Sequence, residues 1–234
     1  MKATKYTTLS FLSCSLLLAG LIAADAPKAA VTGKVTYISS EVAATGPRAD
    51  GAVYTFVDSA DPAIADIVSL GYKTIDRVGG MLVSEVNREL AAKETSLVVS
   101  IMHTKDLQLP KAAPGQPKIT AIKRTSLLIR NPLNAPDGAD QAALDRIHKQ
   151  LMADESPDKV VVQKIEQPGH PLEWRVYRPI ASSQSCLACH GDPKTFKPGV
   201  KEALDAQYPE DKAIDYAAQE WRGMLRVSIT PAAK

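Results

Sequence analysis

Apolar residues in the first half of the chain follow a helical period. Between residues 63 and 90 they recur at spacings of three and four, which predicts one long amphipathic helix. Asp61 is suited to cap the start of this helix, and Pro62 to occupy its first position. Gly79-Gly80 marks a point at which the helix can bend. A shorter second helix is expected over residues 95–104.

The later apolar pattern contains one more helix and then changes to the period of two that is typical of strands. A loop rich in proline precedes these elements at residues 107–118. The expected elements are a strand within 118–129, a helix over 140–153, strands at 160–162 and 172–180 joined by a hairpin turn at 167–170, and a closing strand at 224–229. Helices followed by antiparallel strands predict an α+β domain.

The N-terminal segment has the pattern of a secretory signal peptide. Lys2 and Lys5 are followed by an almost wholly apolar run that ends at Ala24. Cleavage before Asp25 predicts export to the periplasm and a mature chain without a membrane span, and an uncleaved anchor is the alternative. We therefore assign residues 1–24 to the signal peptide, 25–60 to an N-terminal arm or linker with a strand at 34–39, and 61–234 to the main domain.

The charge balance excludes a class of partners. The full chain carries a net charge of +2, and loss of the signal peptide leaves 26 basic and 26 acidic residues. Such a balance does not indicate the excess of basic residues that is typical of proteins that bind nucleic acid or an anionic membrane surface. No nucleic-acid partner is therefore expected.

Candidate chemistry is concentrated in the run Cys186-Leu187-Ala188-Cys189-His190. Two thiols followed at once by an imidazole are the pattern for covalent attachment of c-type haem, with the histidine as proximal iron ligand. A C-x-x-C pair alone also suits zinc, a disulfide or a redox pair. Cys14 lies in the predicted signal peptide, so the mature chain has only the two cysteines of this run. That number disfavours a disulfide framework or a four-thiolate zinc site, and it favours one covalent haem c.

Several further motifs occur in a fixed order around this run. They are R-x-S-x-x-x-R-N-P-x-N-x-P at residues 124–136, Y-x-P-I at 177–180, C-x-x-C-H-G-x-P at 186–193, Y-P-x-D-x-A at 208–213 and R-G at 222–223. In this combination, residues 63–230 resemble the DUF3365 or Tll0287-like family of periplasmic haem c proteins. The resemblance implies a PAS-like antiparallel sheet, an N-terminal helical segment and one covalently bound haem.

The resemblance also bears on the second axial ligand of the iron. Family members often carry a cysteine after an A-I-x-V pattern, and that cysteine resembles a sixth iron ligand. Here the corresponding stretch ends in Met102, with His103 directly after it. Either side chain is a candidate ligand, and an open position is the third alternative. Met102 is equally suited to fill a gap in the core.

Other candidate site residues surround the motif. Arg124, Arg130 and Arg178 are candidates for pairing with haem propionates, because a guanidinium fork suits a carboxylate, or else for stabilising the fold. Tyr177 and Tyr208 are candidates for contact with the porphyrin or for core packing. His148 and His170 are expected to have structural or surface positions.

These features predict a single-haem cytochrome that acts in electron transfer with a redox partner protein. The alternative is a redox or gas sensor, in which a small gas ligand or a redox change acts on the helical segment and signals through a separate partner. An enzyme with open-coordinated haem, such as a peroxidase, is the weakest of the three, since no distal acid–base pair is evident. The oligomeric state stays open.

Overall fold

The computed structural model describes residues 51–102 and 109–232. The predicted signal peptide, the predicted strand at 34–39 and the candidate ligand His103 lie outside the described residues.

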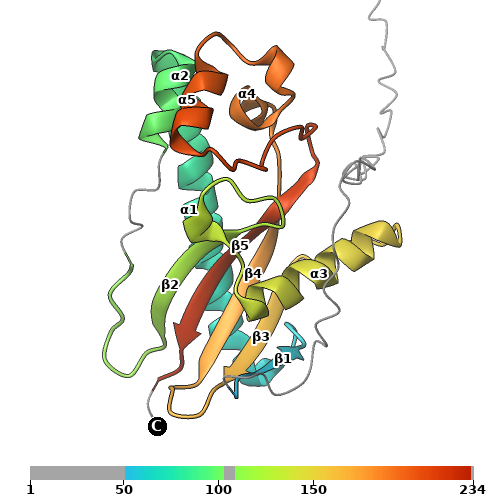
Figure 1. The fold of residues 1–234 in the computed structure, drawn as a ribbon. Coiled ribbons are helices and arrows are strands. Elements are labelled where there is room, and N and C mark those ends of the chain that lie inside the picture. Colours follow the sequence, from blue (N-terminus) through green and yellow to red (C-terminus); the bar gives the residue numbers. More distant parts are fainter. Residues whose placement is uncertain (1–50, 103–108, 233–234) are drawn as a thin grey trace, which may run out of the picture.

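A five-stranded antiparallel sheet with the order β1-β3-β4-β5-β2 forms the centre of the fold (Figure 1). Its strands are β1 Val53–Val57, β2 Lys118–Thr125, β3 Val161–Glu166, β4 Glu173–Ala181 and β5 Trp221–Thr230. Strands β3 and β4 form the predicted hairpin, and the long strand β5 lies between β4 and β2. The α+β class expected from the sequence is confirmed.

The three helices predicted near residues 63–90, 95–104 and 140–153 are present among the five α-helices of the described residues. The five helices are α1 Ala65–Ala92, α2 Thr95–Ile101, α3 Gly138–Met152, α4 Leu187–His190 and α5 Val200–Gln207. A 3-10 turn, Pro62–Ile64, leads into α1, and its N-cap Asp61 accepts a hydrogen bond from the backbone N–H of Ala63, as predicted. Helix α1 continues through Gly79-Gly80 as one helix. The end of α2 differs from the prediction, because Met102 already forms its C-cap.

Helix α1 covers one face of the sheet. Its buried residues Ile67 and Ile75 pack, together with Ile64 of the preceding turn, against alternate positions of the strands, including Val176 and Val227. Gly71 permits the close approach, because a Cβ atom at this position would lie only 2.5 Å from Cβ of Val176. Burial of this apolar face is the main stabilising term for the helix, since an isolated helix is marginal in water.

Helix α3 covers the opposite face of the sheet. Ala143, Leu144 and Ile147 pack against sheet residues that include Tyr177 and Met224. A capping box at Asp137 begins the helix, in which the Asp137 side chain accepts from backbone N–H groups and the Asp140 side chain accepts from the Asp137 N–H. The two faces are therefore each closed by one helix.

Three elements were not predicted from the sequence. Strand β1 lies within the predicted arm of residues 25–60 but pairs with β3, so the sheet begins before residue 61. As an edge strand of five residues, it carries little periodic signal. Helices α4 and α5, of four and eight residues, lie within residues 186–213, where the sequence indicated motifs and no helix or strand was predicted. The strands also do not all follow the helices, because β1 precedes α1 and β2 precedes α3.

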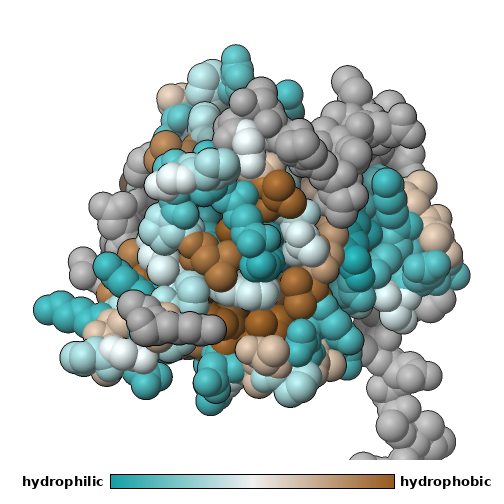
Figure 2. Space-filling model, turned by 90° about the horizontal axis from the view of Figure 1, so that it is seen from below, coloured by the Kyte–Doolittle hydropathy of each residue, from teal (hydrophilic) through white to brown (hydrophobic). Residues whose placement is uncertain are grey.

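Helices α2, α4 and α5 gather at one end of the sheet, beyond the end of β5 at which that strand begins (Figure 1). Val99, Val200, Leu204 and Tyr208 form a small core between them. Figure 2 shows the molecule from below, away from these helices, where apolar residues gather in the middle of a mostly polar face. Within residues 51–102 and 109–232, no helix is both long and apolar enough to cross a membrane.

Candidate functional site

A pocket of about 400 Å³ lies where α1, α2 and α4 meet the C-terminal ends of β2 and β4 and the N-terminal end of β5. Its volume is in the range of small-molecule sites. The three residues of the C-x-x-C-H motif with reactive side chains, Cys186, Cys189 and His190, all line it. The motif is thus part of the wall of a preformed cavity.

Local helical geometry brings these three side chains together. A 3-10 turn, Gln184–Cys186, continues into α4, so the motif lies on about two turns of helical backbone. Residues at positions i, i+3 and i+4 share one side of a helix, and Cys186, Cys189 and His190 have this spacing. Both cysteines are free thiols. Burial raises the pKa of the Cys189 thiol.

The imidazole of His190 is oriented by a backbone carbonyl. Its Nδ1 lies 2.7 Å from the carbonyl oxygen of Ala213. Because a carbonyl only accepts, Nδ1 carries the proton and Nε2 keeps its lone pair. Burial, together with the positive charges of Arg222, Arg130 and Arg124, holds the pKa of His190 well below its usual value. A neutral imidazole fixed through its other nitrogen is the form in which histidine binds metals.

Arg130 holds the motif in position against the rest of the fold. Its Nε donates to Asp211 at 2.8 Å, and its Nη2 donates to the carbonyls of Cys189 at 2.5 Å and Ala213 at 3.1 Å. A longer contact of 3.4 Å joins Nη1 to Nε2 of His190. Most N–H groups of Arg130 thus donate to acceptors within the protein. One of these acceptors is the Ala213 carbonyl, which also orients the histidine.

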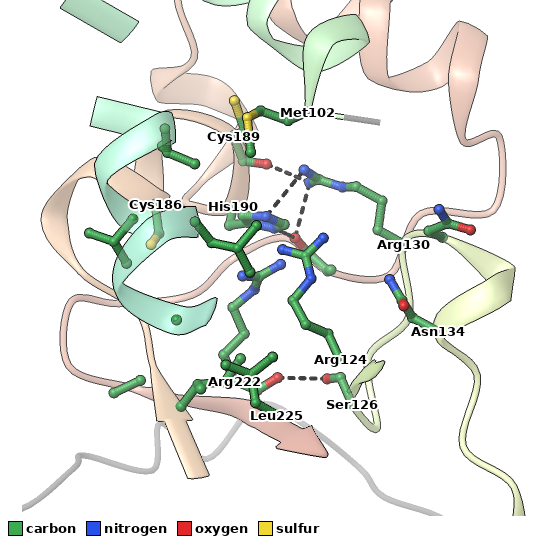
Figure 3. Close-up of a pocket in the computed structure, with 18 of the residues that line it drawn as sticks. Met102, Arg124, Ser126, Arg130, Asn134, Cys186, Cys189, His190, Arg222 and Leu225 are labelled. Carbon is green, nitrogen blue, oxygen red and sulfur yellow. Dashed lines mark hydrogen bonds between the residues drawn. The ribbon is translucent and has the colours of Figure 1, made fainter. Parts of the chain in front are cut away.

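Two other arginines point into the pocket without a carboxylate partner. Figure 3 shows the guanidinium groups of Arg124 and Arg222 directed toward His190. Among the described residues, no aspartate or glutamate forms an ion pair with either of them, and the buried Nε of Arg222 has no hydrogen-bond partner. Burial, followed by the charge of Arg124, lowers the pKa of Arg222 to about 10. Burial likewise lowers the pKa of Arg124.

A β-bulge directs Arg222 into the pocket. Trp221 and Met224 both pack on the α3 side of the sheet although they are three residues apart, so strict alternation is broken between them. The pairing of β4 with β5 shifts at this point, and Gly223 has φ +138°. A Cβ atom at Gly223 would collide with the carbonyl oxygen of Thr125. The bulge thus depends on glycine. A strict alternation of side chains along the strand does not predict it.

The remaining candidates separate into pocket residues and residues that lie elsewhere. Arg178 lines the pocket but is already engaged, with Nη1 2.9 Å from Asp76 and its guanidinium 4.6 Å from the centre of the Tyr72 ring. Tyr208 also lines the pocket. Tyr177 does not, because strand alternation buries it on the opposite face, where its hydroxyl lies 3.1 Å from Asp140 and 3.0 Å from Gln163.

The other two histidines lie outside the pocket lining. His148 is on α3, where its ring stacks with that of Trp221, and burial lowers its pKa. His170 is exposed in the turn between β3 and β4. These positions are structural or superficial, as the sequence predicted.

Of the two candidates for a second axial ligand, Met102 lies within the described residues. It is half-buried at the C-terminal end of α2, and its side chain lines the pocket together with Cys189 (Figure 3). The helix end is held by a hydrogen bond of 2.9 Å from the Met102 N–H to the carbonyl of Val98. A thioether is therefore available in the pocket that contains His190.

Arg222 is the pocket residue that sequence reasoning missed. It is the arginine of the late R-G motif, which carried the family resemblance but was given no role. The rest of the pocket wall is largely apolar, with Leu82, Val83, Val86 and Leu90 contributed by α1. Val83 is 47% exposed, an unusual position for an apolar side chain that lines a cavity. Apolar walls combined with unpaired cations suit a mainly apolar ligand that carries negative charge.

Comparison with known proteins gives one family match and one similar solved structure. That structure is the crystal structure of the cyanobacterial heme-protein Tll0287, with 24% identity and a TM-score of 0.36, covering 48% of this chain and 62% of the other. This chain thus spans less than two thirds of that protein. No curated protein matches. The model of the Tll0287-like family matches residues 56–230, which is well over half of the sequence. The chain therefore belongs to the Tll0287-like family.

Proposed function

We propose that this protein is a mono-haem c-type cytochrome, with Cys186 and Cys189 forming the thioether links and His190 as the proximal ligand. One observation carries the proposal. The C-x-x-C-H turn faces a preformed pocket, and the Ala213 carbonyl fixes the histidine as the tautomer with a free Nε2. Membership in a family that includes a heme-protein of known structure supports the same conclusion.

The residues of the pocket fit a haem group. Two free thiols three positions apart match the spacing required for attachment to the two vinyl groups. The apolar wall of α1 suits a porphyrin face, and the unpaired guanidiniums suit its acidic side chains. An iron ion at Nε2 of His190 would replace the long contact with Arg130. The PAS-like description of the fold is part of this proposal, supported by the five-stranded antiparallel sheet.

The haem would supply one-electron chemistry, and the chain would control its surroundings. The Ala213 carbonyl orients His190 and raises its basicity as a ligand. Arg130 fixes the backbone of the motif through Cys189 and Ala213. Apolar residues of α1 and α2 exclude water, which affects the reduction potential. Met102 is the proposed distal ligand, and a thioether in this position favours the reduced iron.

The proposed role is electron transfer in the periplasm, with a separate redox protein as partner. A sensor is the second candidate, and the position of Met102 favours it. This residue ends the short helix α2, which packs on α5, so loss of the thioether ligand would act directly on two helices. We propose no enzymatic reaction. Export through the predicted signal peptide is part of the proposal.

Haem staining of a denaturing gel tests the proposal. Protein made with a c-type maturation system should give a stained band, and Cys186→Ala combined with Cys189→Ala should abolish it, because both thioether links are lost. His190→Ala should change the Soret band, whereas the control His170→Ala should not. A colourless wild-type band from protein that matured under these conditions would contradict the proposal.

A further inference from the structure

Four arginines line the pocket, and within the described part of the chain two of them, Arg130 and Arg178, form ion pairs. Arg130 is paired with Asp211, and Arg178 is paired with Asp76. Their charges are therefore compensated within the protein. Removal of either would break contacts that the fold already uses.

Arg124 and Arg222 differ from this pair. Neither forms an ion pair within residues 51–102 and 109–232, and the buried Nε of Arg222 lacks any hydrogen-bond acceptor. The nearest aromatic contact of Arg222 is weak, with its guanidinium 6.0 Å from the centre of the Tyr216 ring. Taking a charge out of water without a partner is costly, and buried charges in proteins are normally paired.

The fold nevertheless uses special backbone to place Arg222 in the pocket. The bulge at Gly223 turns this residue away from the α3 face, and the hydroxyl of Ser126 donates to the Arg222 carbonyl at 2.7 Å. Figure 3 shows this hydrogen bond at the base of the pocket, with the Arg124 and Arg222 side chains extending from there toward His190. Two neighbouring cations in this arrangement are suited to bind two carboxylates.

We infer that Arg124 and Arg222 bind the two propionate groups of the haem, whereas Arg130 and Arg178 serve the protein fold. This inference rests on the proposed function. Of the three arginines that the sequence suggested as propionate ligands, Arg124 is kept, and Arg130 and Arg178 are not. Arg222 is added. A guanidinium offers two parallel donors to a carboxylate, which is the geometry needed for a firm and oriented contact.

The reduction potential gives a test that a purely structural arginine would not affect. In Arg222→Gln and Arg124→Gln, a propionate charge is left uncompensated beside the iron, which stabilises the ferric state. The midpoint potential at neutral pH should therefore fall, and the propionate bending bands in the resonance Raman spectrum should shift. Arg178→Gln is the matched control, since it removes the same charge from the same pocket but leaves uncompensated only Asp76, whose side chain is 68% exposed and therefore screened by solvent. The Raman bands should stay at their wild-type positions, and the potential should fall much less than in Arg222→Gln.

The variant Arg222→Lys separates the effect of the positive charge from the effect of the planar guanidinium geometry. This variant should restore most of the potential, but the Raman bands should remain shifted, because an ammonium group lacks the planar fork. Stability gives a second readout. In the full chain made without haem, Arg222→Gln should raise the unfolding midpoint by removing an unpaired charge, whereas in the haem protein the same change should lower it.

These measurements test the assignment of Arg124 and Arg222 separately from the proposal that the protein binds haem. If the wild-type chain carries no haem, the proposed function fails, and this inference fails with it. If haem is present but Arg178→Gln and Arg222→Gln shift the potential and the Raman bands equally, only the assignment of the arginines is wrong. A change of stability with the same sign in both forms would also overturn it.

Discussion

At the scale of single residues, the site depends on how each polar atom is already used. The proton on Nδ1 of His190 is committed to Ala213, and the donors of Arg130 are committed to Asp211 and to two carbonyls. The Nε2 atom of the histidine has a long contact of 3.4 Å with Nη1 of Arg130, and the Met102 thioether lines the same pocket. Under the proposed function, these two groups would be the protein ligands of the iron.

Met102→Ala tests this axial pair. Loss of the thioether should convert low-spin iron to a high-spin or water-bound form that binds carbon monoxide more readily, as seen in the absorption spectrum. His103→Ala is the matched control, because it removes the other candidate ligand and leaves the thioether in place. The reverse pattern would identify His103 as the ligand. No effect of either substitution would leave the distal position open and would favour the sensor.

At the scale of elements, α1 has two functions along its length. Its first half packs on the sheet through residues such as Ile67 and Ile75, and its second half forms a wall of the pocket. Gly79 and Gly80 lie in the pocket-lining stretch, although glycine costs a helix interior about 1 kcal/mol relative to alanine. A Cβ atom at Gly80 would meet no other described atom within 4 Å. Packing within the described part of the chain therefore does not require glycine at this position.

Gly80→Leu is expected to fill the space that the haem requires. The leucine has room in the protein alone, so folding should be preserved, but overpacking against a bound ring costs about 1–3 kcal/mol. We expect a displaced Soret band and reduced haem content per protein. The control Ser84→Leu adds the same side chain to an exposed position of α1 outside the pocket lining. Equal haem content and identical spectra in the two variants would contradict this role of Gly80.

At the scale of the whole molecule, a charge network joins α3 to the sheet. Asp140 is fully buried and lies within hydrogen-bond distance of Lys123, Arg175 and Arg226, as well as the hydroxyl of Tyr177. Removing one member of such a network strands a buried charge, at a cost of about 3–5 kcal/mol. The network lies on the face opposite to α1, so it supports the fold without entering the pocket.

The neighbouring Asp137 makes stability depend on pH. Burial alone would raise its pKa, but hydrogen bonds and the charge of Arg175 outweigh burial and hold the pKa at about 2, below the ordinary 3.8. Its stabilising effect is therefore present above the ordinary pKa and is lost as the pH falls from about 4 toward 2. Asp137→Asn should lower the unfolding midpoint at neutral pH, and the difference from wild type should vanish near pH 2.

Asp205→Asn is the control for this acid dependence. Asp205 pairs with Lys201 on the exposed surface of α5, where an ion pair contributes about 0–1 kcal/mol. Its removal should leave the unfolding midpoint nearly unchanged across the same pH range. If Asp137→Asn and Asp205→Asn gave the same profile, the ion pairs of Asp137 would not be the cause of the acid dependence.

The sequence by itself determined features that depend on neighbours along the chain. The spacing of apolar residues predicted α1, and Asp61 and Pro62 marked the turn that leads into it. The C-x-x-C-H run identified Cys186, Cys189 and His190 as the candidate site. The late strands and their hairpin likewise followed from a period of two. Local geometry was sufficient for these elements.

Only the tertiary structure decided which polar side chains share the pocket. Tyr177 and Arg178 are adjacent in sequence, but strand alternation sends them to opposite faces. Arg130 and Arg178 have carboxylate partners from distant segments, while Arg124 and Arg222 have none among the described residues. Arg222 enters the pocket through a bulge between two strands, and β1 gains its partner from residues more than 100 positions away. Pairing and burial depend on contacts between segments far apart in the chain, and no local pattern in the sequence encodes them.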